Sequence, residues 1–225
     1  MKYSHPYQPP IVTVDAVIFQ IIDNALHVLA VKRTEEPFKG SWALPGGYSA
    51  KGETTIEALT QKVRAKAGID LGTDISHIEQ LYTFDSIARD PRGHAVSVCY
   101  VACGTSLAPA DAASHPEFLP VDTLPHLAYD HDEIISYARE RIAGKLLYTN
   151  IAFSLLPDTF TLSQLQTAYE AVMGRSLDKR NFRKKILSLG IIHETGDSWR
   201  EGAHRPAALY AFDSKDLQTI ARNFE

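Results

Sequence analysis

Two patterns of hydrophobic and polar positions run along the chain, and the first of them predicts β-strands. Residues 11–31 are rich in β-branched and aliphatic side chains and are interrupted only by Asp23 and Asn24, a pair that favours a tight turn. This segment therefore predicts a β-hairpin. Hydrophobic and polar residues also alternate over residues 95–103, and a similar run covers residues 78–84, so both are expected to be strands.

The second pattern is helical. A helix is expected over residues 54–67, because its periodic positions stop at Gly68, and glycine commonly follows the last turn of a helix. Asp130 and Glu133 have the spacing of a capping box and predict a helix that reaches about Ile142. Helices mixed with strands predict an α+β fold for roughly the first 150 residues.

The pattern changes near Lys145, and residues 145–156 are expected to be a connector. Thr161 and Gln164 have capping-box spacing for a helix that ends at Gly174, and a second helix is expected over residues 178–189. Two short β-like runs, IIHETGDSWREG and PAALYAF, follow. Helix, turn, helix and hairpin in this order predict a winged helix-turn-helix.

Composition limits the class of protein. The 225 residues are 44% hydrophobic and 22% charged, which is typical of a globular protein, and the length allows two domains. No apolar stretch approaches the ~20 residues that span a bilayer, and residues 1–10 lack the apolar core of a signal peptide, so we expect a cytoplasmic protein without a membrane partner. Cys99 and Cys103 are expected to be reduced, on one face of a strand.

Basic residues gather in one segment although the formal net charge is −4. Residues 175–185 contain six basic side chains and one acidic side chain, and on a helical wheel Phe182, Ile186 and Leu189 fall opposite most of the basic ones. The apolar side is expected to pack on the preceding helix, leaving the basic side free to enter a DNA major groove. The expected DNA-binding residues are Lys179, Arg180, Asn181, Arg183, Lys184, Arg200, His204 and Arg205. The alternatives are a solvated helix face or a unit that serves only dimerisation.

The stretch from Gly47 to Ile69 resembles the Nudix box, G-x5-E-x7-R-E-U-x-E-E-x-G-U, in which U is aliphatic. The matching residues are Gly47, Glu53, Val63, Gly68 and Ile69. The preceding PFKGSWALPGG is similar to the lead-in of many Nudix domains, and the resemblance covers roughly residues 11–147. It implies an α/β/α sandwich.

The box departs from the Nudix pattern at the positions that matter for catalysis. Gln61 and Lys62 stand in place of R-E, and Ala65 and Lys66 in place of E-E. In Nudix hydrolases these carboxylates hold Mg²⁺ or Mn²⁺. An ammonium about 4 Å from such a cation costs about 4 kcal/mol per unit charge at an effective dielectric near 20. We therefore expect no catalytic residues, no metal site and no required cofactor.

The alternative is an enzyme. If the two lysines faced solvent, then Glu53, Glu57 and carboxylates outside the box would form a non-standard metal site. The chain would then be a Nudix hydrolase of the ADP-ribose pyrophosphatase type.

Residues 86–100, SIARDPRGHAVSVCY, resemble a stretch of Nudix proteins that handle ADP-ribose. Arg89 and Arg92 are candidate diphosphate partners, since a guanidinium offers paired donors, and Phe38 and Trp42 are candidates to stack on a base. Their alternatives are a turn with solvated arginines and a core tryptophan. The full expected effector-binding set is Arg33, Phe38, Trp42, Leu44, Gly46, Gly47, Glu53, Arg89 and Arg92. No role is assigned to His94, His131, Asp132 or Glu133.

A Nudix-like domain without metal ligands, followed by a winged helix, resembles the NrtR family of Nudix-related transcriptional regulators. The segments FTLSQLQTAYEAVMGRSLDKRNFRKKI and RPAALY carry the resemblance to the end of the chain. It implies a bacterial repressor that acts as a homodimer on a palindromic operator and controls genes of NAD metabolism or sugar use. Residues 1–150 would bind ADP-ribose or a related phosphorylated metabolite, and residues 151–225 would bind double-stranded DNA. A regulator that responds to a sugar or sugar phosphate remains the other possibility.

Overall fold

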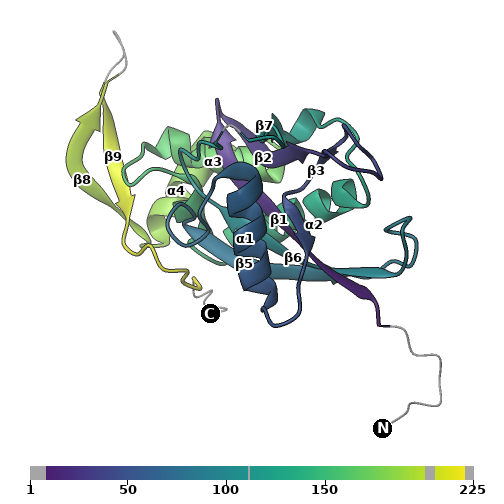
Figure 1. Ribbon diagram of the computed structural model, residues 1–225. Helices are drawn as coiled ribbons and strands as arrows, with labels where there is room; N and C mark the ends of the chain where they lie inside the picture. The colour runs from purple at the N-terminus through teal and green to yellow at the C-terminus, as the bar shows by residue number, and fades with distance from the viewer. Residues whose placement is uncertain (1–8, 111, 201–205, 221–225) are drawn as a thin grey trace.

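The fold is that of a computed structural model, which describes residues 9–110, 112–200 and 206–220 (Figure 1). In chain order the elements are β1 (Ile11–Ile22), β2 (Ala25–Lys32), β3 (Trp42–Ala43), β4 (Gly46–Tyr48), α1 (Thr55–Ala67), β5 (His77–Phe84), β6 (Ala95–Cys103), β7 (Glu117–Pro120), the 3-10 helix η1 (Val121–Thr123), α2 (His131–Leu146), the 3-10 helix η2 (Ile151–Leu155), α3 (Leu162–Met173), α4 (Lys179–Ser188), β8 (Ile192–Trp199) and β9 (Ala207–Phe212).

A mixed sheet separates two helical layers. Its strand order is β3-β2-β1-β6-β5, with β4 paired to β1 and β7 to β2. The central pair, β1 and β6, is parallel. Because side chains alternate along a strand, Ala16 and Ile18 of β1 pack in the cluster on the α1 side, whereas Val17 and Phe19 pack in the cluster that contains α2. The expected α/β/α sandwich is confirmed.

Local signals set the hairpin and the first helix where the sequence predicts them. Asp23 and Asn24 have φ of 48° and 66°, which the turn between β1 and β2 requires. The α1 helix begins after Thr54, which forms a reciprocal capping box with Glu57, and ends at Gly68 in the left-handed region.

The capping box expected at the start of α2 is wrong. The helix does begin after Asp130, but the side chain of Asp130 makes no capping hydrogen bond. Its carboxylate instead accepts two hydrogen bonds from the Arg89 guanidinium, a stronger partner than a backbone N–H. The helix also continues to Leu146, beyond the expected end at Ile142, and η2 occupies part of the expected connector.

The winged helix-turn-helix is confirmed after residue 155. Thr161 and Gln164 form the expected capping box of α3, which ends at Gly174. Asp178 caps α4 by accepting a hydrogen bond from the backbone N–H of Asn181. The β8–β9 hairpin forms the wing, and Phe160 pairs with Tyr210 of β9 through reciprocal backbone hydrogen bonds of 2.9 and 2.8 Å.

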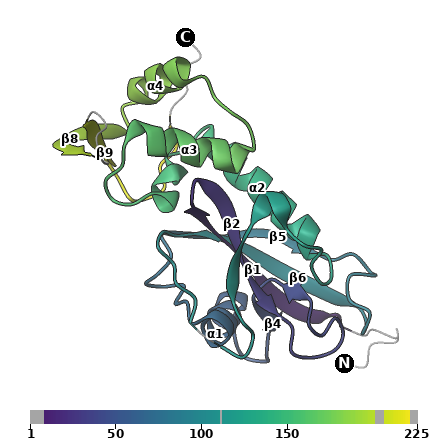
Figure 2. The ribbon, with the colours of Figure 1, turned by 90° about the horizontal axis from the view of Figure 1, so that it is seen from above.

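The winged helix packs directly on the sandwich. Figure 2 shows α2 between the sheet and α3. The Arg139 guanidinium on α2 donates hydrogen bonds of 2.9 Å to the carbonyls of Ala171 and Val172. Both carbonyls lie in the last turn of α3. One cluster of buried hydrophobic side chains runs from Phe19 in the sheet to Ile186 in α4.

Two further expectations concern cysteines and membranes. Both cysteines are free and buried, and burial raises the pKa of the Cys103 thiol to about 12, as expected for inert structural thiols. Among the described residues, no helix combines the length and the apolar character that a bilayer span requires.

Candidate ligand cleft and nucleic-acid interface

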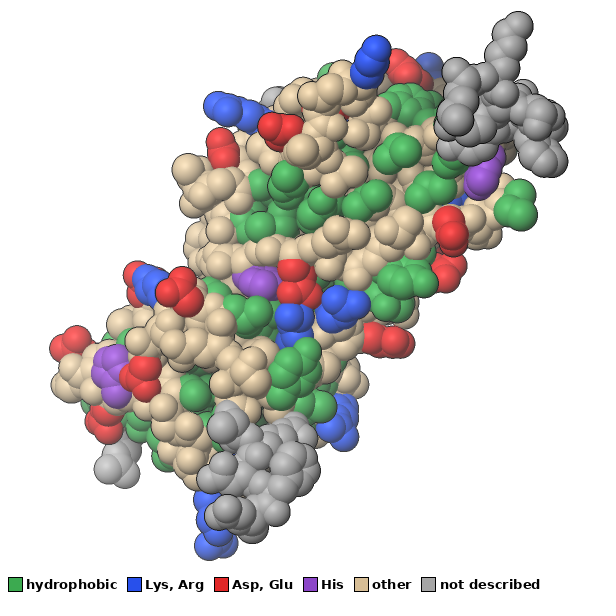
Figure 3. All heavy atoms as spheres, turned by 90° about the horizontal axis from the view of Figure 1, so that it is seen from below, with side chains coloured by type: hydrophobic (Ala, Val, Ile, Leu, Met, Phe, Trp, Pro, Cys, Tyr) green, Lys and Arg blue, Asp and Glu red, His purple; other side chains and the backbone are tan. Residues whose placement is uncertain are grey.

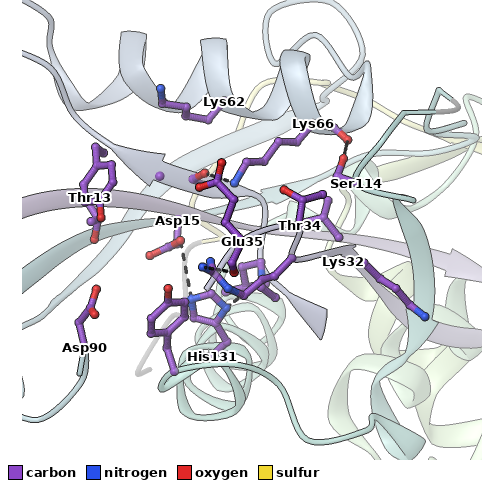
Figure 4. A pocket seen from close by; sticks show the side chains of 18 of the residues that line it. Thr13, Asp15, Lys32, Thr34, Glu35, Lys62, Lys66, Asp90, Ser114 and His131 are labelled. Atoms are coloured by element: carbon purple, nitrogen blue, oxygen red, sulfur yellow. Dashed lines mark hydrogen bonds and ion pairs between the residues drawn. The ribbon is translucent and has the colours of Figure 1, made fainter. Parts of the chain in front are cut away.

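A cleft of about 300 Å³ opens beside β1, between α1 and the start of α2 (Figure 4). Asp15 of β1 and His131 of α2 form its floor, and Lys66 reaches into it from α1. The lining contains the expected residues Arg33, Leu44, Gly46, Gly47, Arg89 and Arg92. Segments that lie far apart in the sequence, from β1 to the start of α2, therefore supply the cleft.

Three of the expected effector-binding residues lie outside this lining. The half-buried Trp42 packs against the hydrophobic core, and its ring lies 4.9 Å from the Lys32 ammonium. The Phe38 ring stands edge-on to Tyr129 at 4.9 Å. The Glu53 carboxylate accepts hydrogen bonds from the Ala50 backbone and the Gln61 side chain. Each of these side chains is held by a contact that the motif does not reveal.

The arginines of the RDPRG segment already hold carboxylates. Arg89 is buried and donates two hydrogen bonds, of 2.9 and 2.8 Å, to Asp130, while Asp15 lies 3.9 Å from the same guanidinium. Arg92 donates in the same forked manner to Asp90, and these hydrogen bonds lower the pKa of Asp90. Arg89 therefore acts first as a positioning residue, because it ties this loop to the start of α2.

A buried histidine completes the floor, and sequence reasoning gave it no role. The Leu44 backbone N–H donates to Nδ1 of His131 at 2.9 Å, and Nε2 lies 3.7 Å from an Asp15 carboxylate oxygen. Burial lowers the pKa of His131, so the ring is neutral at pH 7 and carries its proton on Nε2, facing Asp15. Ser97 donates to the other oxygen of Asp15 at 2.5 Å.

Tyrosines line the cleft in place of the expected Phe38 and Trp42. Tyr129 and Tyr48 both face it, and the Arg92 guanidinium lies 5.8 and 5.3 Å from their ring centres. Tyr129 immediately precedes Asp130 in the sequence but follows Arg92 by more than thirty positions. No pattern of neighbouring residues in the sequence therefore predicts the contact between Tyr129 and Arg92.

Both lysines of the altered box belong to the lining of the cleft, with Lys66 pointing into it and Lys62 lying along α1. The Lys66 ammonium donates a hydrogen bond of 2.7 Å to the Gly46 carbonyl, and burial lowers its pKa. The alkyl stem of Lys62 lies over Gly47, where an added Cβ would sit 3.4 Å from Cδ of the lysine. Gly47 has φ of 154°, a backbone conformation that favours glycine.

The residues present do not fit the divalent cation of Nudix hydrolases. Glu53 is engaged with Ala50 and Gln61, and Glu57 accepts hydrogen bonds from the backbone and hydroxyl of Thr54, which lower its pKa. Within the described ranges, no cluster of three or more His, Cys, Asp and Glu side chains is placed to hold a metal ion. Ammonium groups stand where cation ligands would be needed.

The second candidate site is the exposed side of α4. Lys179, Arg180, Asn181 and Lys184 are exposed, whereas Ile186 is buried and the Phe182 ring packs on Tyr169 at 5.2 Å between ring centres. Figure 3 shows basic, acidic and hydrophobic side chains intermixed over one face of the molecule. The clustered cations of α4 are thus the candidate nucleic-acid interface.

Other members of the expected DNA-binding set have different positions. Arg183 is half-buried and donates to the Ser163 hydroxyl of α3 at 3.2 Å, so its guanidinium turns towards the neighbouring helix. Arg200 is exposed at the end of β8. His204 and Arg205 lie outside the described residues.

Comparison with protein families divides the chain as its fold does. A model of the NUDIX domain matches residues 12–138, and a model described as the NrtR DNA-binding winged helix domain matches residues 152–212.

Three relatives cover these regions. The chain is 35% identical over 217 residues to the ADPR responsive transcriptional repressor NtrR of Acinetobacter baylyi, covering 93% of this chain and 85% of the relative. It is 38% identical over 138 residues to an ADP-ribose pyrophosphatase of Methanocaldococcus jannaschii, covering 60% of this chain and 76% of that protein.

Crystal structures of the third relative, Shewanella oneidensis NrtR, are also similar. The complex with a 27mer DNA has a TM-score of 0.76 and 34% identity, covering 90% of this chain and 93% of that chain. The NUDIX domain complexed with ADP ribose has a TM-score of 0.54 and 35% identity, covering 62% of this chain and 94% of that chain.

Proposed function

Because the chain belongs to the NrtR family of Nudix-related, winged-helix transcriptional regulators, we propose that it is a repressor that responds to ADP-ribose. The effector binds in the cleft, and double-stranded DNA binds to α4 and the wing. One observation carries the proposal: a domain with a cleft rich in lysine and arginine packs on a winged helix whose basic face is exposed. Among the described residues, no cluster of three or more His, Cys, Asp and Glu side chains in this domain could hold a metal ion.

The composition of the cleft supports a nucleoside diphosphate sugar. Lysine and arginine side chains in the lining suit a diphosphate, and the rings of Tyr48 and Tyr129 suit contacts with a base or a ribose. The similar NUDIX domain of the Shewanella oneidensis protein was crystallised with ADP ribose, which favours this ligand over a sugar phosphate.

The DNA-binding unit is proposed to comprise residues 151–225, and the effector-binding unit residues 1–150. In this proposal Arg180 and Lys184 contact phosphates, while Asn181 is placed to read base edges. A homodimer on a palindromic operator would set the two α4 helices one turn of DNA apart, roughly 34–36 Å. Regulated genes would belong to NAD metabolism or sugar use.

Helix α2 connects the two sites. Its start is held in the cleft by the pair of Asp130 with Arg89, and about 13 Å along the helix Arg139 holds the end of α3. A ligand that displaces the start of α2 therefore moves the winged helix. Control of DNA affinity over about 10–100-fold requires a differential binding free energy of only about 1.4–2.8 kcal/mol.

The decisive experiment is a fluorescence anisotropy titration with DNA from the promoter next to the gene. The protein should bind this DNA, and ADP-ribose should change its affinity about tenfold or more. The variant with alanine at Arg180 and Lys184 serves as the control for DNA contact through α4. DNA affinity that is the same with and without ADP-ribose would reject the proposed response.

The hydrolase is a second candidate, favoured by the similarity to the Methanocaldococcus jannaschii pyrophosphatase. We propose that this chain does not cleave ADP-ribose, because the lysines of α1 and the engaged Glu53 and Glu57 leave no ligand set for a catalytic cation among the residues that the structure describes. Incubation with ADP-ribose and Mg²⁺, analysed by chromatography, should yield neither AMP nor ribose 5-phosphate. Rapid, Mg²⁺-dependent formation of both would establish the enzyme instead.

A further inference from the structure

Lys66 occupies the centre of the cleft, and Lys62 lies at its rim. The two residues are one helical turn apart on α1, so they share a face of the helix. Figure 4 shows Lys66 extending from α1 towards the middle of the cleft, while Lys62 lies along the helix. Both belong to the lining.

Both ammonium groups retain unused donors. The hydrogen bond of Lys66 to the Gly46 carbonyl uses one N–H, and an ammonium has more donors than that. Among the described residues, the Lys62 ammonium has no hydrogen-bond or ion-pair partner. Each lysine is thus able to bond an anionic oxygen without releasing a carboxylate.

The arginines of the cleft are committed elsewhere. Arg89 is paired with Asp130, and Arg92 with Asp90. Arg33 donates to the backbone carbonyls of Pro37 and Glu35. Lys32 and Arg33 also line the cleft, and their cationic groups lie 4.9 Å from the rings of Trp42 and Tyr129. Among the described residues, Lys62 and Lys66 are therefore the basic side chains of this lining that pair with neither a carboxylate nor an aromatic ring.

The same helix face carries the cation ligands in catalytic Nudix domains, where the cation in turn contacts the diphosphate. We propose that Lys66, assisted by Lys62, takes the place of that cation, so that this chain binds the diphosphate of its effector without any divalent metal. The inference rests on the proposed function, because it requires ADP-ribose to enter this cleft. The metal-to-ammonium replacement converts a site for phosphate chemistry into a site for phosphate recognition.

Isothermal titration calorimetry of ADP-ribose into the full chain tests this, once in EDTA and once with Mg²⁺. The expected result is binding in EDTA with an affinity within about twofold of that in Mg²⁺. Binding that appears only with Mg²⁺ overturns the inference and leaves the proposed function standing. Absence of binding in both buffers overturns both.

Variants on α1 locate the charge. Lys66→Gln should weaken ADP-ribose binding by roughly 10- to 100-fold, the effect of losing a hydrogen bond to a charged group, and Lys66→Arg should retain most of the affinity. Arg64→Gln is the matched control, because it also removes one positive charge from α1. The Arg64 side chain, however, is 72% exposed and paired with Asp70. Equal affinities of Lys66→Gln and Arg64→Gln would overturn the assignment.

A charge reversal gives an independent readout. The double variant Lys62→Glu with Lys66→Glu restores carboxylates at positions where the Nudix box has them. Its binding of ADP-ribose should be weak in EDTA and should recover with Mg²⁺, whereas wild-type binding should not respond. Thermal unfolding of each variant confirms that it is folded, and binding by the double variant in EDTA at wild-type affinity would overturn the proposal.

Discussion

The ion pair of Arg89 with Asp130 gives a prediction whose size follows from its burial. The side chains are 3% and 13% exposed, and two hydrogen bonds of 2.9 and 2.8 Å join them. Asp130→Ala removes the carboxylate and leaves a buried guanidinium whose nearest remaining carboxylate, Asp15, is 3.9 Å away. Removing one partner of a buried pair costs about 3–5 kcal/mol, because the other charge stays desolvated.

Urea denaturation at pH 7, followed by tryptophan fluorescence, measures this loss without the screening that guanidinium chloride would add. We expect the free energy of unfolding to fall by about 3 kcal/mol, with a decrease in Tm of about 6–12 °C. Asp122→Ala is the control: it also removes the partner of an arginine on α2, but Asp122 is 66% exposed, so the expected loss is about 1 kcal/mol or less.

A second substitution separates the unpaired charge from the lost contacts. Arg89→Met in the Asp130→Ala background removes the isolated guanidinium, and part of the lost stability should return. If Asp130→Ala lowers the free energy of unfolding no more than Asp122→Ala does, burial does not make the ion pair of Arg89 with Asp130 important for stability, and the reasoning is refuted.

Three further predictions concern DNA, pH and packing. Replacing Arg180 and Lys184 by alanine should lower the slope of log affinity against log salt by about 2, whereas Lys215→Ala, an exposed lysine off α4, should leave the slope unchanged in the same anisotropy assay. Burial lowers the pKa of His131 in the folded protein, so as the pH falls below about 6.5 the histidine is protonated in the unfolded chain before it is protonated in the folded protein. The free energy of unfolding, measured in urea, should therefore decrease as the pH falls, and it should decrease less steeply in His131→Gln. Gly46→Ala should cost more than about 3 kcal/mol in urea, since its Cβ would lie 2.2 Å from a backbone oxygen of β1, and a loss below about 1 kcal/mol would contradict that clash.

Features that depend on a few neighbouring residues could be predicted from the sequence. Asp23 and Asn24 specify the hairpin turn because both adopt positive φ, and Thr54 with Glu57 specifies the start of α1. These signals act within four residues and need no knowledge of the rest of the fold.

The cleft could be predicted only in part, because its side chains choose between local and distant partners. Asp130 has the local option of capping α2 but binds Arg89, which lies 41 positions earlier. Arg183 has a position suited to DNA, yet its guanidinium bonds to Ser163. In each case a charged group finds a stronger or closer partner across the fold, and a single sequence does not encode which one.

The unbroken hydrophobic cluster between sheet and winged helix has a practical consequence. Phe160 and Leu165, both fully buried, belong to the same cluster as Val17 and Phe19, so cutting the chain near residue 150 would expose an apolar surface on each fragment. We expect the whole chain to melt as one cooperative unit. The effector-binding and DNA-binding activities therefore have to be separated by point substitutions rather than by truncation of the chain.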